Sequence, residues 1–200
     1  MKTNDCLRRL RYILALDDAA MMATFADGEL SVTREQVSNW LKRDDDPSWQ
    51  ICLDQELASF LNGLIIRKRG RRPGPPVAAE ARLTNNIVLK KLKIAFSLEA
   101  DEILKLLAQQ SVNLSKHELS AFFRKPNHRH YRECKDQVLR NLLSALQRKL
   151  RPDDRTTGDA PQTNFSAEEF PASATSASKQ PGPEPQDPWA RAQSKRSKPS

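Results

Sequence analysis

The side chains best suited to chemistry gather in one short segment, residues 126–134. His128, His130 and Cys134 offer ring nitrogen and sulfur atoms there, which are ligand types that zinc prefers. A closed structural zinc site is built from four ligands with supporting partners, and this segment supplies three. We therefore favour a solvent-facing basic loop over a metal site, and we expect no cofactor.

The cysteines are the other candidates for catalysis. The chain has Cys6, Cys52 and Cys134 without a Cys-x-x-Cys spacing, which indicates a reducing compartment and no disulfide framework. Cys52 and Cys134 each lie two residues before an expected helix start, where the helix dipole lowers a thiol pKa. A nucleophilic cysteine also needs a base, and no histidine precedes His117. We interpret both thiols as buried packing groups, and we predict that the protein is not an enzyme.

An internal repeat organises the chain around these residues. Shifted by 82 positions, residues 4–68 lie on residues 86–150 without a gap. Identical pairs include Leu7 and Leu89, Cys52 and Cys134, Asp54 and Asp136, Leu57 and Leu139, and Leu61 and Leu143. Because most shared residues are of core or capping types, the two copies have a scaffold in common.

Each copy is predicted to form about four helices. Leucines at spacings of three and four mark the first and last helix, and no alternating run of β-branched residues predicts a sheet. The third helix begins with a capping box in both copies, Thr33 with Gln36 and Ser115 with Glu118. The predicted fold class is therefore all-α, with two tandem homologous helical units and an appended tail.

Capping residues and composition set the segment boundaries. The fourth helix of each copy is predicted to start after an N-capping aspartate, Asp54 or Asp136, and Gly70 is predicted to end the first of them. Proline and glycine then indicate a stiff linker, and the last fifty residues are rich in Pro and Ser. The predicted segments are a first repeat (1–70), a linker (71–83), a second repeat (84–150) and a disordered tail (151–200).

Positive charge is concentrated in the second repeat. The chain has a formal net charge of +8. Residues 1–72 hold 12 Lys and Arg against 11 Asp and Glu, whereas residues 83–150 hold 13 against 6. Because the two copies share a scaffold, this difference indicates that their surfaces have diverged toward different partners.

Several motifs resemble those of a known family. The chain carries Leu-Arg-Arg-Leu-Arg-Tyr (7–12), Phe-Leu-Asn-Gly-Leu-Ile-Ile (60–66), Asn-Asn-Ile-Val-Leu-Lys-Lys-Leu (85–92), Phe-Arg-Lys-Pro (123–126) and Tyr-Arg-Glu-Cys (131–134). Over residues 3–150 these motifs resemble the bacterial YehS-like family. The resemblance implies a small cytoplasmic protein with a tandem domain of unknown function, and it supplies no catalytic residue.

The second and third helices of each copy are similar to a helix-turn-helix. A short helix, a turn near Asp27 and Gly28, and a capped helix would place the third helix in a major groove, while cations of the second repeat neutralise phosphates. The candidate nucleic-acid-binding residues are Arg34, Asn39 and Lys42 in the first repeat, and Lys90, Lys91, Lys93, Lys116, Arg124, Lys125, Arg129 and Arg132 in the second. We therefore hypothesise a non-enzymatic binding protein whose partner is DNA or RNA.

A protein partner is the alternative hypothesis. Solvated Lys and Arg faces are common on small helical units, which weakens any inference from charge alone. The acidic run 44–46 could meet the basic face of the second repeat in a dimer. Tyr131 among cations is suited to stacking a base, but Trp49 holds the matching position beside the acidic run, so we interpret both aromatic residues as packing anchors.

Hydropathy predicts no membrane association. No apolar stretch approaches the roughly 18 residues that cross a bilayer, and arginines interrupt the first apolar residues where a signal peptide would need an unbroken run. We therefore expect a cytoplasmic protein.

Overall fold

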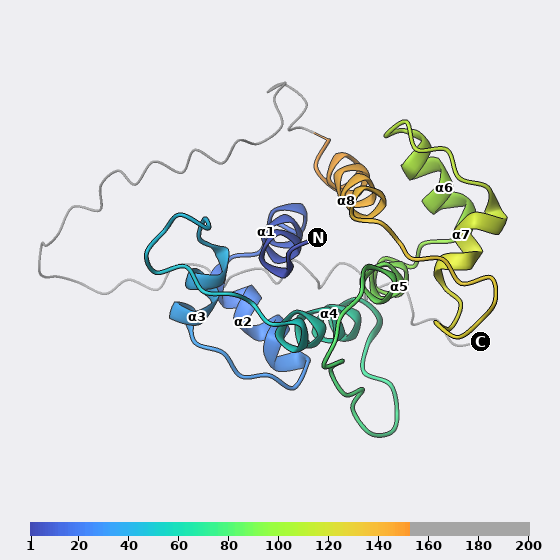
Figure 1. The fold of residues 1–200 in the computed structure, drawn as a ribbon. Helices are drawn as coiled ribbons and strands as arrows, with labels where there is room; N and C mark the ends of the chain where they lie inside the picture. The colour runs from blue at the N-terminus through green and yellow to red at the C-terminus, as the bar shows by residue number, and fades with distance from the viewer. Residues whose placement is uncertain (153–200) are drawn as a thin grey trace, which may run out of the picture. The chain divides into compact units, whose positions relative to one another are not determined.

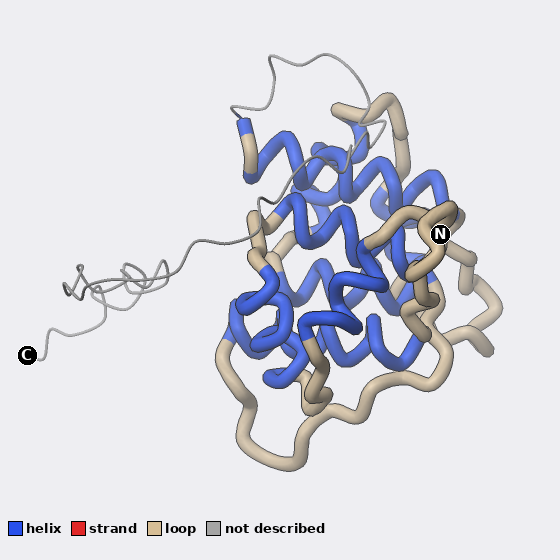
Figure 2. The backbone as a smooth tube through the Cα atoms, turned by 90° about the vertical axis from the view of Figure 1, so that its left-hand side faces the viewer, coloured by secondary structure: helices blue, strands red, loops and turns tan. Residues whose placement is uncertain are grey.

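The computed structural model describes residues 1–152, and this part of the chain is all-α, with eight helices and no strand (Figures 1 and 2). The first repeat contains α1 (Thr3–Ile13), α2 (Asp18–Asp27), α3 (Arg34–Leu41) and α4 (Asp54–Arg69). The second contains α5 (Asn85–Ala95), α6 (Ala100–Ala108), α7 (Lys116–Phe122) and α8 (Asp136–Leu150). The predicted fold class is confirmed, and the predicted disordered tail lies outside the described residues from 153 onward.

Both predicted capping boxes are present. At the start of α3 the Thr33 hydroxyl accepts from the Gln36 amide at 3.1 Å, and the Gln36 side chain accepts from the Thr33 amide at 2.9 Å. At the start of α7 the same two bonds join Ser115 and Glu118, at 3.2 and 3.0 Å. These bonds satisfy backbone donors that a helix start leaves free, and they pull the pKa of the Glu118 carboxyl below its ordinary value.

The start of the fourth helix differs from the prediction by one residue. Asp54 and Asp136 are the first helical residues of α4 and α8, and neither side chain caps its helix. Their carboxylates instead bind the chain that leads into α5: Asp54 accepts from the Leu83 amide at 2.9 Å, and Asp136 accepts from the Asn85 side chain at 2.7 Å. The two aspartates therefore bind tertiary partners and do not cap their own helices. Gly70 ends α4, as predicted, with a φ of 83°.

A buried asparagine near the start of each repeat holds the loop that follows the third helix. The Asn4 amide donates to the carbonyls of Trp40 and Gln50, both at 2.8 Å, and its oxygen accepts from the Cys52 amide at 3.1 Å. Asn86 forms the same three bonds, at 2.9, 2.8 and 2.9 Å, with the residues 82 positions further on, Phe122, Arg132 and Cys134. One side chain in each copy thus positions both ends of a loop of nine residues.

The two repeats pack against each other through their first and last helices. α1 of the first repeat lies against α8 of the second, and α4 lies against α5 (Figure 1). The buried apolar residues of both repeats form a single cluster. Units of about 70 residues bury little apolar surface alone, so sharing a core is the physical advantage of the tandem arrangement.

The two repeats differ in how closely the second and fourth helices approach. In the first repeat Gly28 and Gly63 let α2 and α4 touch through their backbones, because a Cβ on Gly63 would lie 1.7 Å from the Thr24 carbonyl oxygen. In the second repeat Ala145 holds the position of Gly63 and is fully buried, so that crossing has room for a methyl group.

No helix within residues 1–152 is long and apolar enough to cross a membrane.

Candidate nucleic-acid interface

The candidate interface is built on the loop between the third and fourth helices, which we call corner loop one (42–50) and corner loop two (124–132). In corner loop one, backbone bonds run from Asp46 to Arg43, from Trp49 to Asp46 and from Gln50 to Asn39, at 3.0, 2.9 and 3.2 Å. Corner loop two has the same bonds 82 positions on, from His128 to Lys125, from Tyr131 to His128 and from Arg132 to Ala121, at 2.9, 2.8 and 3.2 Å. The two loops therefore share one backbone framework.

Corner loop one neutralises its own charges. The Asp44 carboxylate binds the Lys2 ammonium and lies 3.7 Å from the Arg8 guanidinium. Within the loop, Lys42 lies 3.7 Å from Asp46, and Arg43 lies 3.5 Å from Asp45. The Lys2 hydrogen bond holds the pKa of the Asp44 carboxyl below its ordinary value. Each carboxylate of the acidic run has a cationic partner, so this corner presents a self-compensated surface.

Corner loop two keeps the cations and lacks the carboxylates. Pro126, Asn127 and His128 occupy the positions of the acidic run, while Arg124 and Lys125 remain at the positions of Lys42 and Arg43. Arg129 adds a cation where the first repeat has a proline, and Lys90 replaces Arg8. Among residues 1–152 these four cations form no ion pair. An anion that approaches this corner therefore meets uncompensated positive charge.

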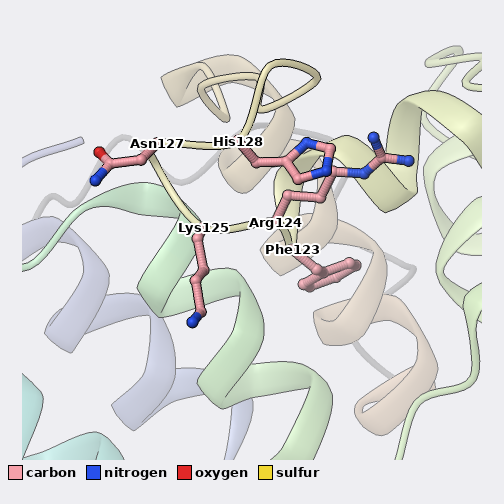
Figure 3. Close-up of a pocket in the computed structure, with 5 residues that line it drawn as sticks. All are labelled: Phe123, Arg124, Lys125, Asn127 and His128. Atoms are coloured by element: carbon pink, nitrogen blue, oxygen red, sulfur yellow. The ribbon is translucent and has the colours of Figure 1, made fainter.

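A shallow pocket lies at the start of corner loop two. It has a volume of about 460 Å³ and is lined by Phe123, Arg124, Lys125, Asn127 and His128. Figure 3 shows the Arg124 and Lys125 side chains pointing in different directions, with the Phe123 ring below Arg124 and the Asn127 amide turned away from that ring. The ammonium group of Lys93, from α5, lies 5.5 Å from the centroid of the Phe123 ring. The pocket thus combines the Phe123 ring with several cations.

Two other predicted contacts of the second repeat are exposed but already paired. The Lys116 ammonium lies 2.8 Å from an Asp101 carboxylate oxygen, and the Arg132 guanidinium lies 3.6 Å from a Glu118 oxygen. Both pairs are at the N-terminal end of α7, which is the part of a recognition helix that would meet base edges. Their charge is locally compensated, unlike that of corner loop two.

The prediction that Lys91 contacts phosphate is wrong. Lys91 is only 6% exposed, because α5 lies against α4 and covers it. Its ammonium group binds the side-chain oxygen of Asn62 and lies 2.9 Å from a Glu80 carboxylate oxygen. Asn62 in turn donates to the Val77 carbonyl at 3.0 Å. Lys91 therefore joins α5, α4 and the linker, and burying an ammonium group is tolerable because these partners satisfy it.

The outward-facing role predicted for Asn39 is also wrong. Asn39 is 8% exposed, since α3 packs against both α1 and α2 and two of its sides are covered. Lys42 is held by Asp46, and Arg34 is exposed with its guanidinium 3.9 Å from Asp18. The three residues predicted for the first repeat therefore do not form one open cationic face.

The histidines and cysteines do not converge. Among the described residues no group of three His, Cys, Asp or Glu side chains is arranged to hold a metal ion. The His128 and His130 rings are 5.7 Å apart and exposed, whereas Cys134 is fully buried. Burial raises the pKa of the Cys134 thiol to about 12 and raises that of Cys52 as well. The predicted interpretation of both thiols as buried packing groups is confirmed.

Phe123 is a residue of the candidate site that the predicted nucleic-acid contacts did not include. Phe123 follows directly after α7 and is half-buried, so that it both packs against the hydrophobic core and lines the pocket. The signal that points to it is the repeat itself, since the matching residue in the first repeat is Leu41. A ring at this position is specific to the second repeat.

The structure defines an all-α tandem-repeat protein. In corner loop one the charges are paired, and in corner loop two Arg124, Lys125 and Arg129 have no carboxylate partner among the described residues. Comparison with known families shows that the chain belongs to a family described as "Protein of unknown function (DUF1456)", which matches residues 3–70 and 85–151. One relative is the uncharacterized protein YehS of Escherichia coli (strain K12), with 46% identity over 147 residues, which is 73% of this chain and 94% of the relative. No solved structure matches the chain. The resemblance to the YehS-like family is confirmed.

Proposed function

We propose that this protein acts by binding, without catalysis, and that corner loop two binds the phosphate backbone of nucleic acid. The observation that carries the proposal is the pair of corner loops. They have the same backbone bonds, and only the second lacks the carboxylates that would compensate its cations. Phosphate neutralisation by Lys and Arg supplies most of the non-specific affinity for nucleic acid.

Arg124, Lys125, Arg129 and Lys90 are the residues assigned to the phosphates. A guanidinium group can bind a phosphate through two parallel hydrogen bonds, and an ammonium group binds it as a point charge. Lys91 and Asn39 have no part in this interface, because both are buried. Lys116 and Arg132 are secondary contacts, since each would have to share its charge with a carboxylate partner.

The test is fluorescence anisotropy of the full chain with labelled nucleic acid of about 12 nucleotides, at salt concentrations from about 50 to 200 mM. We expect Arg124→Gln with Lys125→Gln to weaken binding at least about tenfold and to reduce the salt slope by roughly two. The matched control is Lys42→Gln with Arg43→Gln, which removes the same charge from corner loop one. Equal losses in both double variants, or no binding by the wild type, would contradict the proposal.

A second candidate function is self-association through the first repeat. It is favoured by Ile51 and Leu53, which are 59% and 55% exposed on either side of the buried Cys52. The second repeat has Glu133 and Lys135 at these positions. Sedimentation velocity of the full chain tests this function, and we expect Ile51→Glu with Leu53→Lys to dissociate any dimer. A monomeric wild type at all concentrations would exclude it.

A further inference from the structure

We propose that the pocket beside Phe123 holds one unpaired nucleotide, so that the nucleic acid bound by this protein is single-stranded. The inference rests on the proposed function and names the form of its ligand. In this arrangement a base stacks on the Phe123 ring, and the phosphates on either side of that base meet the cations of corner loop two.

The pocket brings together the two groups that single-strand recognition needs. Proteins that bind single strands combine a cationic surface that follows the backbone with aromatic rings on which bases stack. Phe123 is half-buried, so part of its ring packs on the core and part faces the pocket. Arg124 and Lys125 line the same pocket.

The directions of the two cationic side chains fit consecutive phosphates. Figure 3 shows Arg124 and Lys125 leaving neighbouring backbone positions and diverging. One base between two phosphates requires cations on both sides of an aromatic ring rather than a single cluster. The Lys93 ammonium, 5.5 Å from the centroid of the Phe123 ring, adds positive charge from α5.

The geometry is less suited to a duplex. Groove recognition places the N-terminal end of a helix against base edges. α7 has seven residues, and at its N-terminal end Lys116 is paired with Asp101 while Glu118 adds a carboxylate. Three of the uncompensated cations lie in the loop after α7, and the bases of a duplex could not stack on the Phe123 ring there because they are already paired and stacked inside the double helix.

The first repeat provides an internal reference for the stacking role. Leu41 holds the position of Phe123 in the first repeat, and the acidic run follows it. The first repeat therefore has no ring at the position of Phe123, and the Lys42 and Arg43 cations that follow are each paired with a carboxylate. Phe123→Leu introduces the residue that the first repeat has at this position, so the variant is expected to fold. A change in binding would then report the loss of stacking.

The experiment uses four labelled probes with the full chain: a 12-mer of dT, a 12-mer of rU, an abasic deoxyribose-phosphate 12-mer and a 12-base-pair duplex. We expect both 12-mers with bases to bind roughly tenfold or more tightly than the abasic strand, because stacking on an aromatic side chain is strongly favourable per base. We expect Phe123→Leu to remove this preference while the affinity for the abasic strand stays unchanged. Phe123→Tyr keeps the ring and should retain the preference.

Each outcome separates the two proposals. Binding of all four probes with equal affinity, unaffected by Phe123→Leu, would overturn the single-strand inference and leave phosphate binding intact. A duplex preference would overturn it in the same way. No binding to any probe would overturn the proposed function itself. The dT and rU arms distinguish DNA from RNA as the source of the strand, and far-UV circular dichroism confirms that each variant is folded.

Discussion

Corner loop one and corner loop two have the same backbone hydrogen bonds and different electrostatics: charges are paired in the first, whereas most cations of the second have no carboxylate partner among the described residues. The first holds three carboxylates that pair with nearby cations, and the second holds Pro126, Asn127 and His128 in their place. Asp46 and His128 even share a local role, since each accepts from the amide two residues on, at 2.8 and 3.1 Å. The comparison teaches that the scaffold and the surface of this protein are specified by different residues.

The largest expected effect tests the shared scaffold. Asn4→Ala or Asn86→Ala removes three hydrogen bonds and leaves one buried carbonyl and one buried amide without this partner, so we expect a loss of about 3 kcal/mol in the free energy of unfolding. Urea denaturation followed by circular dichroism measures it, with the exposed Asn113→Ala as a near-neutral control. Nucleic-acid binding should weaken in the Asn86 variant far more than in the Asn4 variant. Equal binding losses would mean that corner loop one also contributes.

The second prediction concerns the helix crossings. We expect Gly63→Ala to destabilise the protein by about 3 kcal/mol, because the new methyl group would collide with the Thr24 carbonyl and force α2 away from α4. The reverse change in the second repeat, Ala145→Gly, should cost only about 1 kcal/mol through helix propensity and lost packing. Thermal denaturation of both variants measures the difference. Similar losses would show that the two crossings are equally close.

The third prediction exchanges the loop side chains. Replacing residues 126–128 by three aspartates should weaken nucleic-acid binding by about ten- to a hundredfold at low salt, because the carboxylates repel phosphate and compensate the cations. The reverse graft, Asp44→Pro with Asp45→Asn and Asp46→His, should create a second binding corner. Anisotropy titrations measure both. A chain that carries both exchanges has the wild-type net charge, so it shows whether position or total charge matters.

The smallest effect is the pH dependence of stability that Asp44 contributes in corner loop one. The pKa of Asp44 lies below its ordinary value of 3.8, chiefly because Lys2 donates to its carboxylate. A lowered folded-state pKa gives stability that is present above the unfolded value and is lost as the pH falls through the folded one. Asp44→Asn should therefore be slightly less stable than the wild type at pH 6 and equal to it near pH 2. A difference that persists at pH 2 would point to another cause. Denaturation midpoints at both pH values give the measurement.

Sequence periodicity was sufficient for the helices because local rules dominate them. The capping boxes at Thr33 and Ser115 and the stop at Gly70 depend on neighbours within one helical turn, and all three are present. The predicted caps Asp54 and Asp136 were wrong by one residue, because each carboxylate binds a group near the start of α5. Capping rules consider only neighbouring residues, so they could not predict a partner that is distant in the sequence.

The candidate site depended more on tertiary structure. Charge counting predicted that the second repeat is the basic one, but it could not separate Lys90, which is exposed, from Lys91, which is buried between α4 and α5. Charge counting also left out Phe123, which packs partly against the core and partly lines the pocket. Aligning the two repeats with the offset of 82 would have indicated the site. It shows that Leu41 is matched by Phe123, and that the three carboxylates of 44–46 are matched by Pro126, Asn127 and His128.

The sequence by itself determined the repeat, the all-α class, the helix starts at the capping boxes and the concentration of charge in one copy. These features follow from spacing and composition, which act over a few residues or over a whole copy. Only the tertiary structure decided which cations are paired, which are buried and which face solvent, because ion pairs such as Lys2 with Asp44 and Lys91 with Glu80 join separate segments. A cation is available to bind a ligand only where no carboxylate of the protein compensates it, and the folded structure determines which carboxylates lie close enough to do so.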